Sequence, residues 1–154
     1  MFEWLVLAGF GVACMAAAAT GAMFPPGQWY RDLSKPGWTP PDWLFPLAWT
    51  ALYIAMTIAA WRLVLSGDPL APLAAAVWSA QIALNTLWSP VFFGLRRIGA
   101  GLVVLVLLWL AVASAVAVAI RIDTTSALLL APYLVWVSYA GALNLSILRR
   151  NPSV

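Results

Sequence analysis

The sequence predicts an all-α membrane protein, a bundle of five transmembrane helices, and three observations support this fold class. The chain has 154 residues, of which 64% are hydrophobic and 8% charged, and its mean hydropathy is +0.94. A water-soluble domain of this length could not bury so much apolar surface. The apolar residues also fall into segments of about 20 residues, the length that crosses a hydrocarbon core. Finally, the charged residues lie between these segments or near their ends.

Five apolar segments are long enough to span a membrane. The first is expected to be a retained helix rather than a signal peptide, because it carries Glu3 near its start and no Lys or Arg. No long polar linker interrupts the series, so a single domain is expected over residues 1–154. The predicted helices are 4–24, 43–65, 72–94, 99–120 and 126–148, and the long first loop is 25–42.

Local signals mark the ends and the irregular points of these helices. Pro72 is expected in the first turn of the third helix, where a missing backbone N–H costs nothing. Thr125 or Ser126 is expected to cap the fifth helix. Pro90 and Pro132 fall inside the third and fifth helices, where each proline removes a hydrogen bond and predicts a kink.

The basic residues are distributed unequally between the two ends of the predicted bundle. Arg62 and Arg121 lie at one end, whereas the first loop, the loop between the third and fourth helices and the C-terminus together carry six bases. Because cytoplasmic loops are enriched in Lys and Arg, the N-terminus is predicted outside and the C-terminus in the cytoplasm. The six bases are Arg31, Lys35, Arg96, Arg97, Arg149 and Arg150.

The ionisable residues exclude several classes of function. The chain has no histidine and one cysteine, Cys14, so a metal site built from histidines or from several thiolates is not expected. All five acidic residues lie in loops or near the termini, whereas ion-coupled pumps need such groups within the membrane. A net charge of +3, with bases in pairs rather than along one face, also argues against nucleic acid as a partner.

Ten tryptophans are the most unusual feature of the composition. Trp4, Trp43 and Trp61 lie at helix ends, where an aromatic belt at the membrane surface explains them. With a rise of about 1.5 Å per residue, seven residues from four helices lie about 9 to 18 Å from the cytoplasmic helix ends. A cavity open toward the first loop would bring them together around a flat apolar ligand. These residues are Trp49, Tyr53, Asn85, Trp88, Trp109, Trp136 and Ala140.

The third predicted helix has two distinct faces. Trp78, Gln81, Asn85, Trp88 and Phe92 share one stripe because of their spacing of three and four residues. The amides in this stripe are costly against lipid, so they should face protein, ligand or water. Small residues cover roughly the opposite face and permit close packing, either against a helix of the same chain or in a homodimer. This small-residue face consists of Ala76, Ser79, Ala80 and Ala83.

Several motifs run through the chain. Residues 29–41 read WYRDLSKPGWTPP and residues 85–94 read NTLWSPVFFG, while FPLAWT, PYLVW and LN occupy residues 45–50, 132–136 and 143–144. In order and spacing these motifs resemble those of the TspO/MBR family, over essentially the whole chain. Its members are the translocator proteins, also called tryptophan-rich sensory proteins or peripheral-type benzodiazepine receptors. The likeness suggests a bacterial-type member in the inner cell membrane.

The resemblance implies a five-helix bundle, usually a dimer, that binds porphyrins such as protoporphyrin IX and isoquinoline- or benzodiazepine-type drugs. Trp49 and Asn85 match the family's ligand-contacting tryptophan and asparagine. Trp136 matches a tryptophan linked to porphyrin chemistry, and Ala140 matches an alanine whose replacement by threonine alters ligand binding. From their places in the motifs, ligand contacts are also expected for Trp29, Trp38 and Asn144. Members also bind sterols, but Leu145 replaces the aromatic residue of the sterol motif, which weakens that expectation here.

The leading functional hypothesis is a membrane protein that binds and senses a tetrapyrrole and requires no cofactor. The porphyrin plane would stack on Trp and Tyr faces, with its propionates near Arg31 and Lys35. Metal-free protoporphyrin IX fits better than haem, because the chain has no histidine to bind iron. Two alternatives stay open: light-dependent porphyrin degradation through Trp136 or Trp49, and transport of porphyrin or lipid. Membrane lipid and a second copy of the chain are the other expected partners.

Overall fold

The predicted apolar segments are helical in the computed structural model, which describes residues 1–152; Ser153 and Val154, the end of the predicted 1–154 domain, lie outside the described residues. A short helix, α2 (Gln28–Asp32), lies within the loop predicted over 25–42. A single π-helical turn, η1 (Pro90–Gly94), follows α4. The long helices are α1 (Phe2–Met23), α3 (Leu44–Val64), α4 (Ala71–Ser89), α5 (Ile98–Ile122) and α6 (Thr124–Arg150).

Helix α6 begins earlier than predicted, because Asp123 caps it rather than Thr125 or Ser126. The Asp123 carboxylate accepts hydrogen bonds from the backbone N–H of Ser126 at 3.0 Å and from its hydroxyl at 2.5 Å. A carboxylate at this position satisfies a free backbone donor and interacts favourably with the helix dipole. The same carboxylate pairs with Arg62 at 2.8 Å, which links the start of α6 to the end of α3.

At Pro90 the chain changes from an α-helix to a π-helical turn, whereas the sequence predicted only a kink. Helix α4 ends at Ser89, and the backbone N–H of Leu95 then donates to the Pro90 carbonyl at 2.8 Å, five residues earlier. This spacing defines a π-helical turn, a feature often found near functional sites. In contrast, α6 continues as one helix through Pro132, and Pro72 lies in the first turn of α4 as predicted.

Four helices are long and apolar enough to cross a membrane, namely α1, α3, α5 and α6. No stretch of α4 reaches the same length and mean hydropathy, and this helix carries Gln81 and Asn85. Large apolar side chains such as Leu128 and Val135 are exposed on the outside of the bundle, as expected for surfaces that face lipid. The described chain is therefore an all-helical, multi-pass membrane protein with four helices of this kind, one fewer than predicted.

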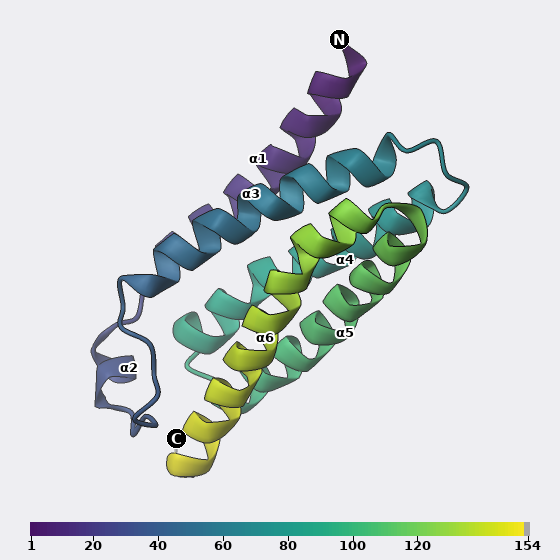
Figure 1. Ribbon diagram of the computed structural model, residues 1–154. Coiled ribbons are helices and arrows are strands. Elements are labelled where there is room, and N and C mark those ends of the chain that lie inside the picture. The colour runs from purple at the N-terminus through teal and green to yellow at the C-terminus, as the bar shows by residue number, and fades with distance from the viewer. Residues whose placement is uncertain (153–154) are drawn as a thin grey trace.

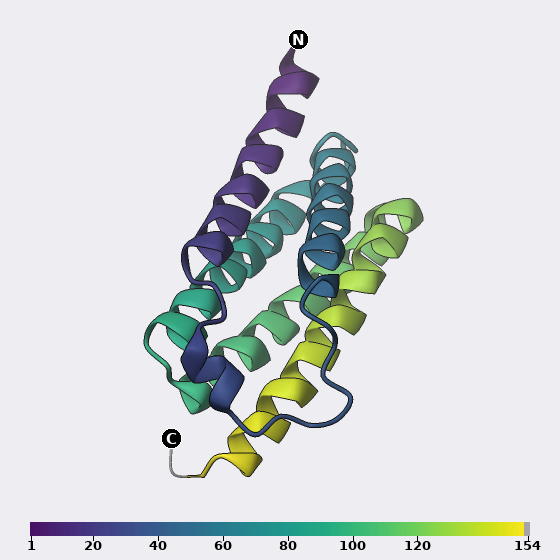
Figure 2. The same cartoon turned by 90° about the vertical axis from the view of Figure 1, so that its left-hand side faces the viewer.

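The long helices form a ring in the order α1, α3, α6, α5 and α4, in which each packs against its two neighbours (Figure 2). Helix α3 also contacts α4 across the ring. One end of the bundle carries α2, the connection from η1 to α5, and the end of α6 (Figure 1). The N-terminus and the connection from α3 to α4 lie toward the opposite end (Figures 1 and 2). The six bases counted in the sequence therefore gather at the α2 end.

Hydrogen bonds hold the first loop across the α2 end of the bundle. The Tyr139 hydroxyl of α6 donates to the carbonyl of Trp38 at 2.5 Å. The Asn151 side chain pairs with both backbone groups of Ser34 at 3.0 Å. Within the loop, the Lys35 ammonium donates to three backbone carbonyls at 2.7 to 3.0 Å. The loop is thereby tied to α6 next to the cavity described below.

Candidate ligand cavity

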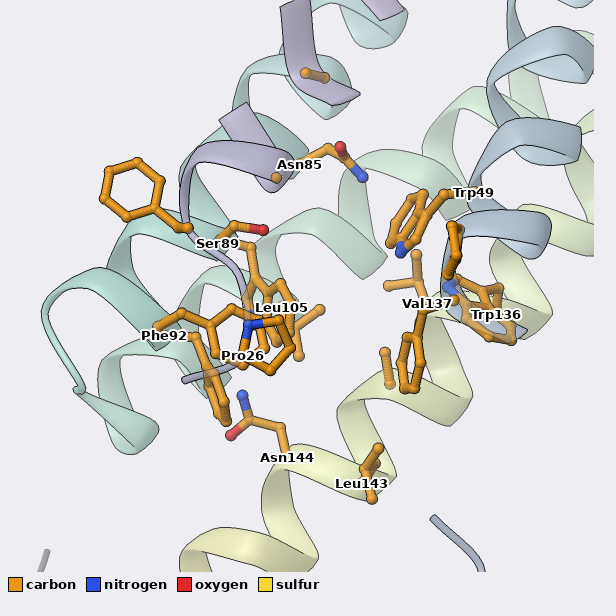
Figure 3. A pocket seen from close by; sticks show the side chains of 18 of the residues that line it. Pro26, Trp49, Asn85, Ser89, Phe92, Leu105, Trp136, Val137, Leu143 and Asn144 are labelled. Atoms are coloured by element: carbon orange, nitrogen blue, oxygen red, sulfur yellow. The ribbon is translucent and has the colours of Figure 1, made fainter. Parts of the chain in front are cut away.

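The bundle contains a cavity of about 510 Å³ at the end that carries α2 (Figure 3). Residues of all five long helices, the first loop and η1 form its wall. Small-molecule sites typically measure about 300–1,000 Å³ and have mostly apolar walls with a few polar groups. The aromatic and polar lining residues are Phe24, Tyr30, Asp42, Phe45, Trp49, Thr50, Tyr53, Asn85, Trp88, Ser89, Phe92, Phe93, Trp136, Tyr139 and Asn144.

One wall of the cavity is an aromatic cluster from α3 and α6. The Trp49 ring stacks on Tyr53 with centroids 5.4 Å apart and meets the Trp136 ring almost at a right angle, 6.3 Å away. Trp136 in turn stacks on Tyr139 at 6.1 Å and meets Phe45 edge-on at 5.9 Å. Such ring pairs stabilise one another's orientation. The cluster therefore presents rigid aromatic surfaces to the cavity.

A second aromatic cluster, from α4 and η1, lies on the opposite side. Trp88 stacks on Phe92 with centroids 5.0 Å apart, and Phe93 meets Phe92 edge-on at 4.9 Å. Figure 3 shows Phe92 on one side of the cavity and Trp49 and Trp136 on the other. A planar apolar molecule between the two clusters would contact aromatic rings on both sides.

The polar group of Asn85 is paired within the protein. The Tyr53 hydroxyl donates to Asn85 Oδ1 at 2.8 Å, and Asn85 Nδ2 donates to the Tyr133 hydroxyl at 3.0 Å. Asn85 is 8% exposed and Tyr133 is completely buried. The chain of hydrogen bonds joins α3, α4 and α6, and it satisfies an amide that would be costly if unpaired. The amide predicted to contact ligand is thus already engaged by two tyrosines.

Two other residues of the cavity wall carry buried polar atoms that no group in residues 1–152 partners. These atoms are both amide heavy atoms of Asn144, which is 2% exposed, and Nε1 of Trp88. Gln81 also has an unpartnered amide, but it does not line the cavity. An unsatisfied buried polar group costs about 1–3 kcal/mol. The cavity therefore has one polar region that is internally satisfied and one that is not.

The charge at the cavity differs from the sequence-based expectation. Asp42, in the first loop, is the charged residue of the described lining. Lys35 is held by three loop carbonyls, and Arg31 donates to Gln28 Oε1 at 3.2 Å. Neither base lines the cavity. The geometry does not place Arg31 and Lys35 where porphyrin propionates would lie in the cavity, because the loop engages these side chains elsewhere.

Comparison with known proteins establishes the relationship of this chain. A model of the TspO/MBR family matches residues 5–150. The chain belongs to the TspO/MBR family. It is 51% identical to protein CrtK of Rhodobacter capsulatus, over 96% of this chain and 93% of that relative. Identity to the tryptophan-rich sensory protein of Cereibacter sphaeroides is 44%, over 97% and 93% of the two chains. Identity to the human translocator protein is 33%, over 96% and 91%.

In this TspO/MBR protein, seven of the ten residues predicted to contact ligand line the cavity. Trp29, Trp38 and Trp109 do not. Trp109 is 38% exposed, and its Nε1 donates to the Ser138 hydroxyl at 2.8 Å. The rise per residue gives the height of a residue along its helix but not its direction about the helix axis. For this reason Trp109 was also predicted to line the cavity. The seven lining residues are Trp49, Tyr53, Asn85, Trp88, Trp136, Ala140 and Asn144.

The contribution of α1 to the cavity was not predicted. Ala17, Ala18, Gly21 and Ala22 line the wall on this side. They carry neither an aromatic ring nor a side-chain polar group, and they lie outside the motifs noted in the sequence. The run of small residues near the end of α1 was the available signal, since small side chains leave space beside a helix.

The small-residue face of α4 is exposed in the single chain. Gln81 and Asn85 of the same helix are buried, so the two faces predicted for this helix are observed. Packing of the small-residue face against another helix of the same chain, the alternative to a dimer, does not occur within the described residues. The exposed small residues are Ala76, Ser79, Ala80 and Ala83.

Proposed function

We propose that this TspO/MBR protein binds a tetrapyrrole of the protoporphyrin IX type in its cavity and acts as a membrane sensor of it. The observation that carries the proposal is the pair of aromatic clusters on opposite sides of a cavity of about 510 Å³. Aromatic side chains bind flat apolar rings by stacking and by burial of area. The relative from Cereibacter sphaeroides is named a tryptophan-rich sensory protein, which supports the sensing role. Isoquinoline- and benzodiazepine-type drugs are expected to compete for the same cavity.

Light-dependent breakdown of the porphyrin is a second candidate, favoured by the contact between the Trp49 and Trp136 rings. An indole beside an excited porphyrin is a candidate electron donor, and photo-oxidation requires both light and oxygen. Illumination with protoporphyrin IX in air, compared with darkness and with illumination under argon, separates the two candidates. Breakdown would be favoured if two results were obtained together. Porphyrin absorbance would have to be lost only when both light and oxygen are present, and Trp136→Phe would have to slow that loss.

In the membrane, α4 together with η1 would form the fifth span. Helix α4 has 19 residues, a length of about 28 Å, and it lies between two apolar helices, α1 and α5. Its amides at Gln81 and Asn85 are buried inside the bundle. A helix whose polar side chains point inward can cross a membrane without a high mean hydropathy.

The proposed orientation places the α2 end of the bundle in the cytoplasm. Six bases gather there, against two at the other end, and cytoplasmic segments are enriched in Lys and Arg. In a bacterial inner membrane, alkaline phosphatase fused before Met1 behind an export signal should be active, and a fluorescent protein fused at the C-terminus should fluoresce. The opposite pattern would reverse the orientation and place the cavity at the outer side.

Porphyrin titration tests the proposed binding site. Protoporphyrin IX should quench tryptophan fluorescence saturably in the intact protein. Trp136→Ala should weaken binding by about 0.5–1.5 kcal/mol beyond the loss of contact area, because a stacked ring is removed. Ala140→Thr should also weaken it, since a branched polar side chain would enter the cavity.

Trp4→Ala is the matched control for these substitutions. Trp4 is 69% exposed, lies in the first turn of α1 and does not line the cavity. Its loss should leave porphyrin affinity unchanged. Binding that responds to salt but ignores both Trp136→Ala and Ala140→Thr would indicate adsorption through surface bases. That outcome would contradict the cavity as the porphyrin site.

A further inference from the structure

We propose that a second hollow, at the end of the bundle opposite α2, binds the headgroup of a zwitterionic phospholipid, with its phosphate on Arg62 and its primary ammonium group on Asp123. The hollow has a volume of about 330 Å³, and its described lining consists of Trp61, Arg62, Leu65, Ser66, Ile122 and Asp123. None of these residues lines the aromatic cavity. The proposal is therefore independent of any ligand in that cavity.

The hollow lies at the level where a lipid headgroup would lie. Arg62 is in the last turn of α3, and Asp123 connects the end of α5 with the start of α6. Both lie at the end of the bundle away from α2 (Figure 1). Trp61 lines the hollow as well, and tryptophan is enriched at the headgroup level of membrane proteins. The charged groups of the hollow are thus placed among headgroups rather than among acyl chains.

The guanidinium of Arg62 has hydrogen-bonding capacity that the described chain does not use. Its Nε and Nη2 donate to the two carboxylate oxygens of Asp123 at 2.8 and 3.1 Å, whereas its Nη1 makes no hydrogen bond within residues 1–152. A guanidinium carries donors on all its nitrogens and matches phosphate oxygens in shape. The Arg62 side chain is 40% exposed, so a phosphate can reach Nη1 without breaking the ion pair.

The carboxylate of Asp123 has one oxygen that is less engaged than the other. Its Oδ2 accepts from Arg62 and from both the backbone N–H and the hydroxyl of Ser126. Its Oδ1 accepts only from Arg62 Nη2 among the described residues. A carboxylate oxygen can accept more than one hydrogen bond, so Oδ1 can also accept from an ammonium group.

The other polar side chains of the hollow are already engaged. Trp61 Nε1 donates to the carbonyl of Glu3 at 3.1 Å, and the Ser66 hydroxyl donates to the carbonyl of Leu63 at 2.7 Å. The rest of the described lining is apolar. The hollow therefore offers one cationic donor, one anionic acceptor and an apolar surface for the glycerol and the first methylene groups of a lipid.

The opposite charges of the ion pair select among headgroups. Arg62 and Asp123 leave the described lining without net charge, which suits a headgroup that carries both signs. A phosphate binds a guanidinium through charge-assisted hydrogen bonds, and a primary ammonium group can donate to a carboxylate. The quaternary ammonium of phosphatidylcholine has no N–H to donate, and diacylglycerol has no phosphate. We expect phosphatidylethanolamine to bind most tightly and diacylglycerol least tightly.

Native mass spectrometry of the intact protein in a maltoside detergent tests this order. The three lipids are titrated singly and with identical acyl chains. Phosphatidylethanolamine should bind about tenfold more tightly than diacylglycerol, with phosphatidylcholine between them. Equal affinities for the three lipids would overturn the proposal. Inorganic phosphate in excess should leave the lipid bound, whereas displacement of the lipid would indicate a site for free phosphate and would overturn the lipid as the ligand.

Two charge variants locate the phosphate contact. Arg62→Gln removes the guanidinium and should reduce the tenfold preference to near unity. Arg121→Gln is the matched control, because Arg121 is an exposed base in the last turn of α5 that does not line the hollow. It changes the net charge equally and should retain the preference. Loss of the preference in both variants would indicate attraction by total charge and would overturn the site.

Asp123→Asn tests the ammonium contact separately, since asparagine still caps a helix. The difference between phosphatidylethanolamine and phosphatidylcholine should disappear in this variant, while both still bind more tightly than diacylglycerol. A difference that persisted would overturn Asp123 as the partner of the ammonium group.

Leu65→Trp fills the hollow without changing either charged residue, and it keeps the test decisive if Arg62→Gln fails to fold. Leu65 lines the hollow and is half-buried at the end of α3, so a larger ring can enter the space that the lipid would occupy. Phosphatidylethanolamine should then bind no more tightly than diacylglycerol, with the circular dichroism spectrum unchanged. A full preference in this variant would overturn the hollow as the binding site.

Discussion

The buried side chains of this bundle show how the surroundings of a residue determine what it can do. Asn85 and Asn144 are both asparagines on the wall of one cavity. Two tyrosines saturate the Asn85 amide, whereas the Asn144 amide is unpaired among the described residues. The first therefore contributes to holding three helices together, whereas the second contributes no side-chain hydrogen bond within the described residues. A buried hydrogen bond adds modestly to the stability of the fold, whereas a buried polar group without a partner lowers that stability by more.

The carboxylate of Asp42 leads to a prediction about ligand charge. It is the charged side chain of the described lining, so it should repel the two propionates of protoporphyrin IX. Asp42→Asn should tighten binding of protoporphyrin IX about two- to fivefold at low salt, and less at high salt. Affinity for the uncharged dimethyl ester should stay the same. Equal effects on the acid and the ester would show that Asp42 acts through shape rather than charge.

At the scale of elements, the junction between α5 and α6 shows one side chain performing two tasks. Asp123 caps α6 through Ser126 and pairs with Arg62 at the end of α3. The guanidinium of Arg62 and the hydrogen bonds of Ser126 hold the pKa of Asp123 below its ordinary value of 3.8. Because the pKa is lower in the folded chain, the charged carboxylate stabilises the fold above about pH 4, and this stabilisation is lost as the pH falls toward the folded value.

Asp123→Asn tests this junction, because asparagine still caps a helix but cannot form the ion pair. The variant should unfold at a temperature about 2–4 °C lower at pH 7. Thermal unfolding followed by circular dichroism from pH 7 to pH 3 should show this difference shrinking below pH 4. Asp68→Asn is the control, since Asp68 accepts a hydrogen bond from the backbone N–H of Leu70 without a basic partner in residues 1–152. A difference that persisted unchanged at pH 3 would contradict the role of the ion pair.

At the scale of the whole molecule, we propose the exposed small-residue face of α4 as the contact surface for a second copy. Small side chains permit close helix packing, which is a main source of association between helices in lipid. The cavity lies inside the bundle and the small-residue face lies outside it. Assembly and ligand binding are therefore expected to be separable by substitution.

Ala83→Phe is predicted to disrupt the proposed dimer by placing a ring between the two copies. Size-exclusion chromatography with light scattering in detergent should show a monomer, with helical content and porphyrin binding retained. Ala117→Phe, at an exposed alanine of α5, should leave the dimer intact. A dimer unaffected by Ala83→Phe would exclude this face of α4 as the contact.

Much of the fold followed from the sequence, because the constraints imposed by a membrane are simple. Spans need about 20 apolar residues and charges avoid the hydrocarbon core, so the positions of the long helices were evident. The height of Trp49, Asn85 and Trp136 along their helices followed from the rise per residue. The two faces of α4 followed from its periodicity. These properties depend only on neighbours along the chain.

The tertiary structure decided which side chains share the cavity and which polar atoms are satisfied. Trp109 was expected at the cavity from its height along α5, but it bonds Ser138 and does not line the cavity. The small residues of α1 complete the wall without any distinctive chemistry. Lys35 turned to the loop carbonyls, and Asp123 replaced the predicted cap because Arg62 and α3 lie beside it. The rotation of each helix about its axis and the pairing of each polar group depend on contacts between residues distant in sequence. Those contacts form only when the five long helices pack together.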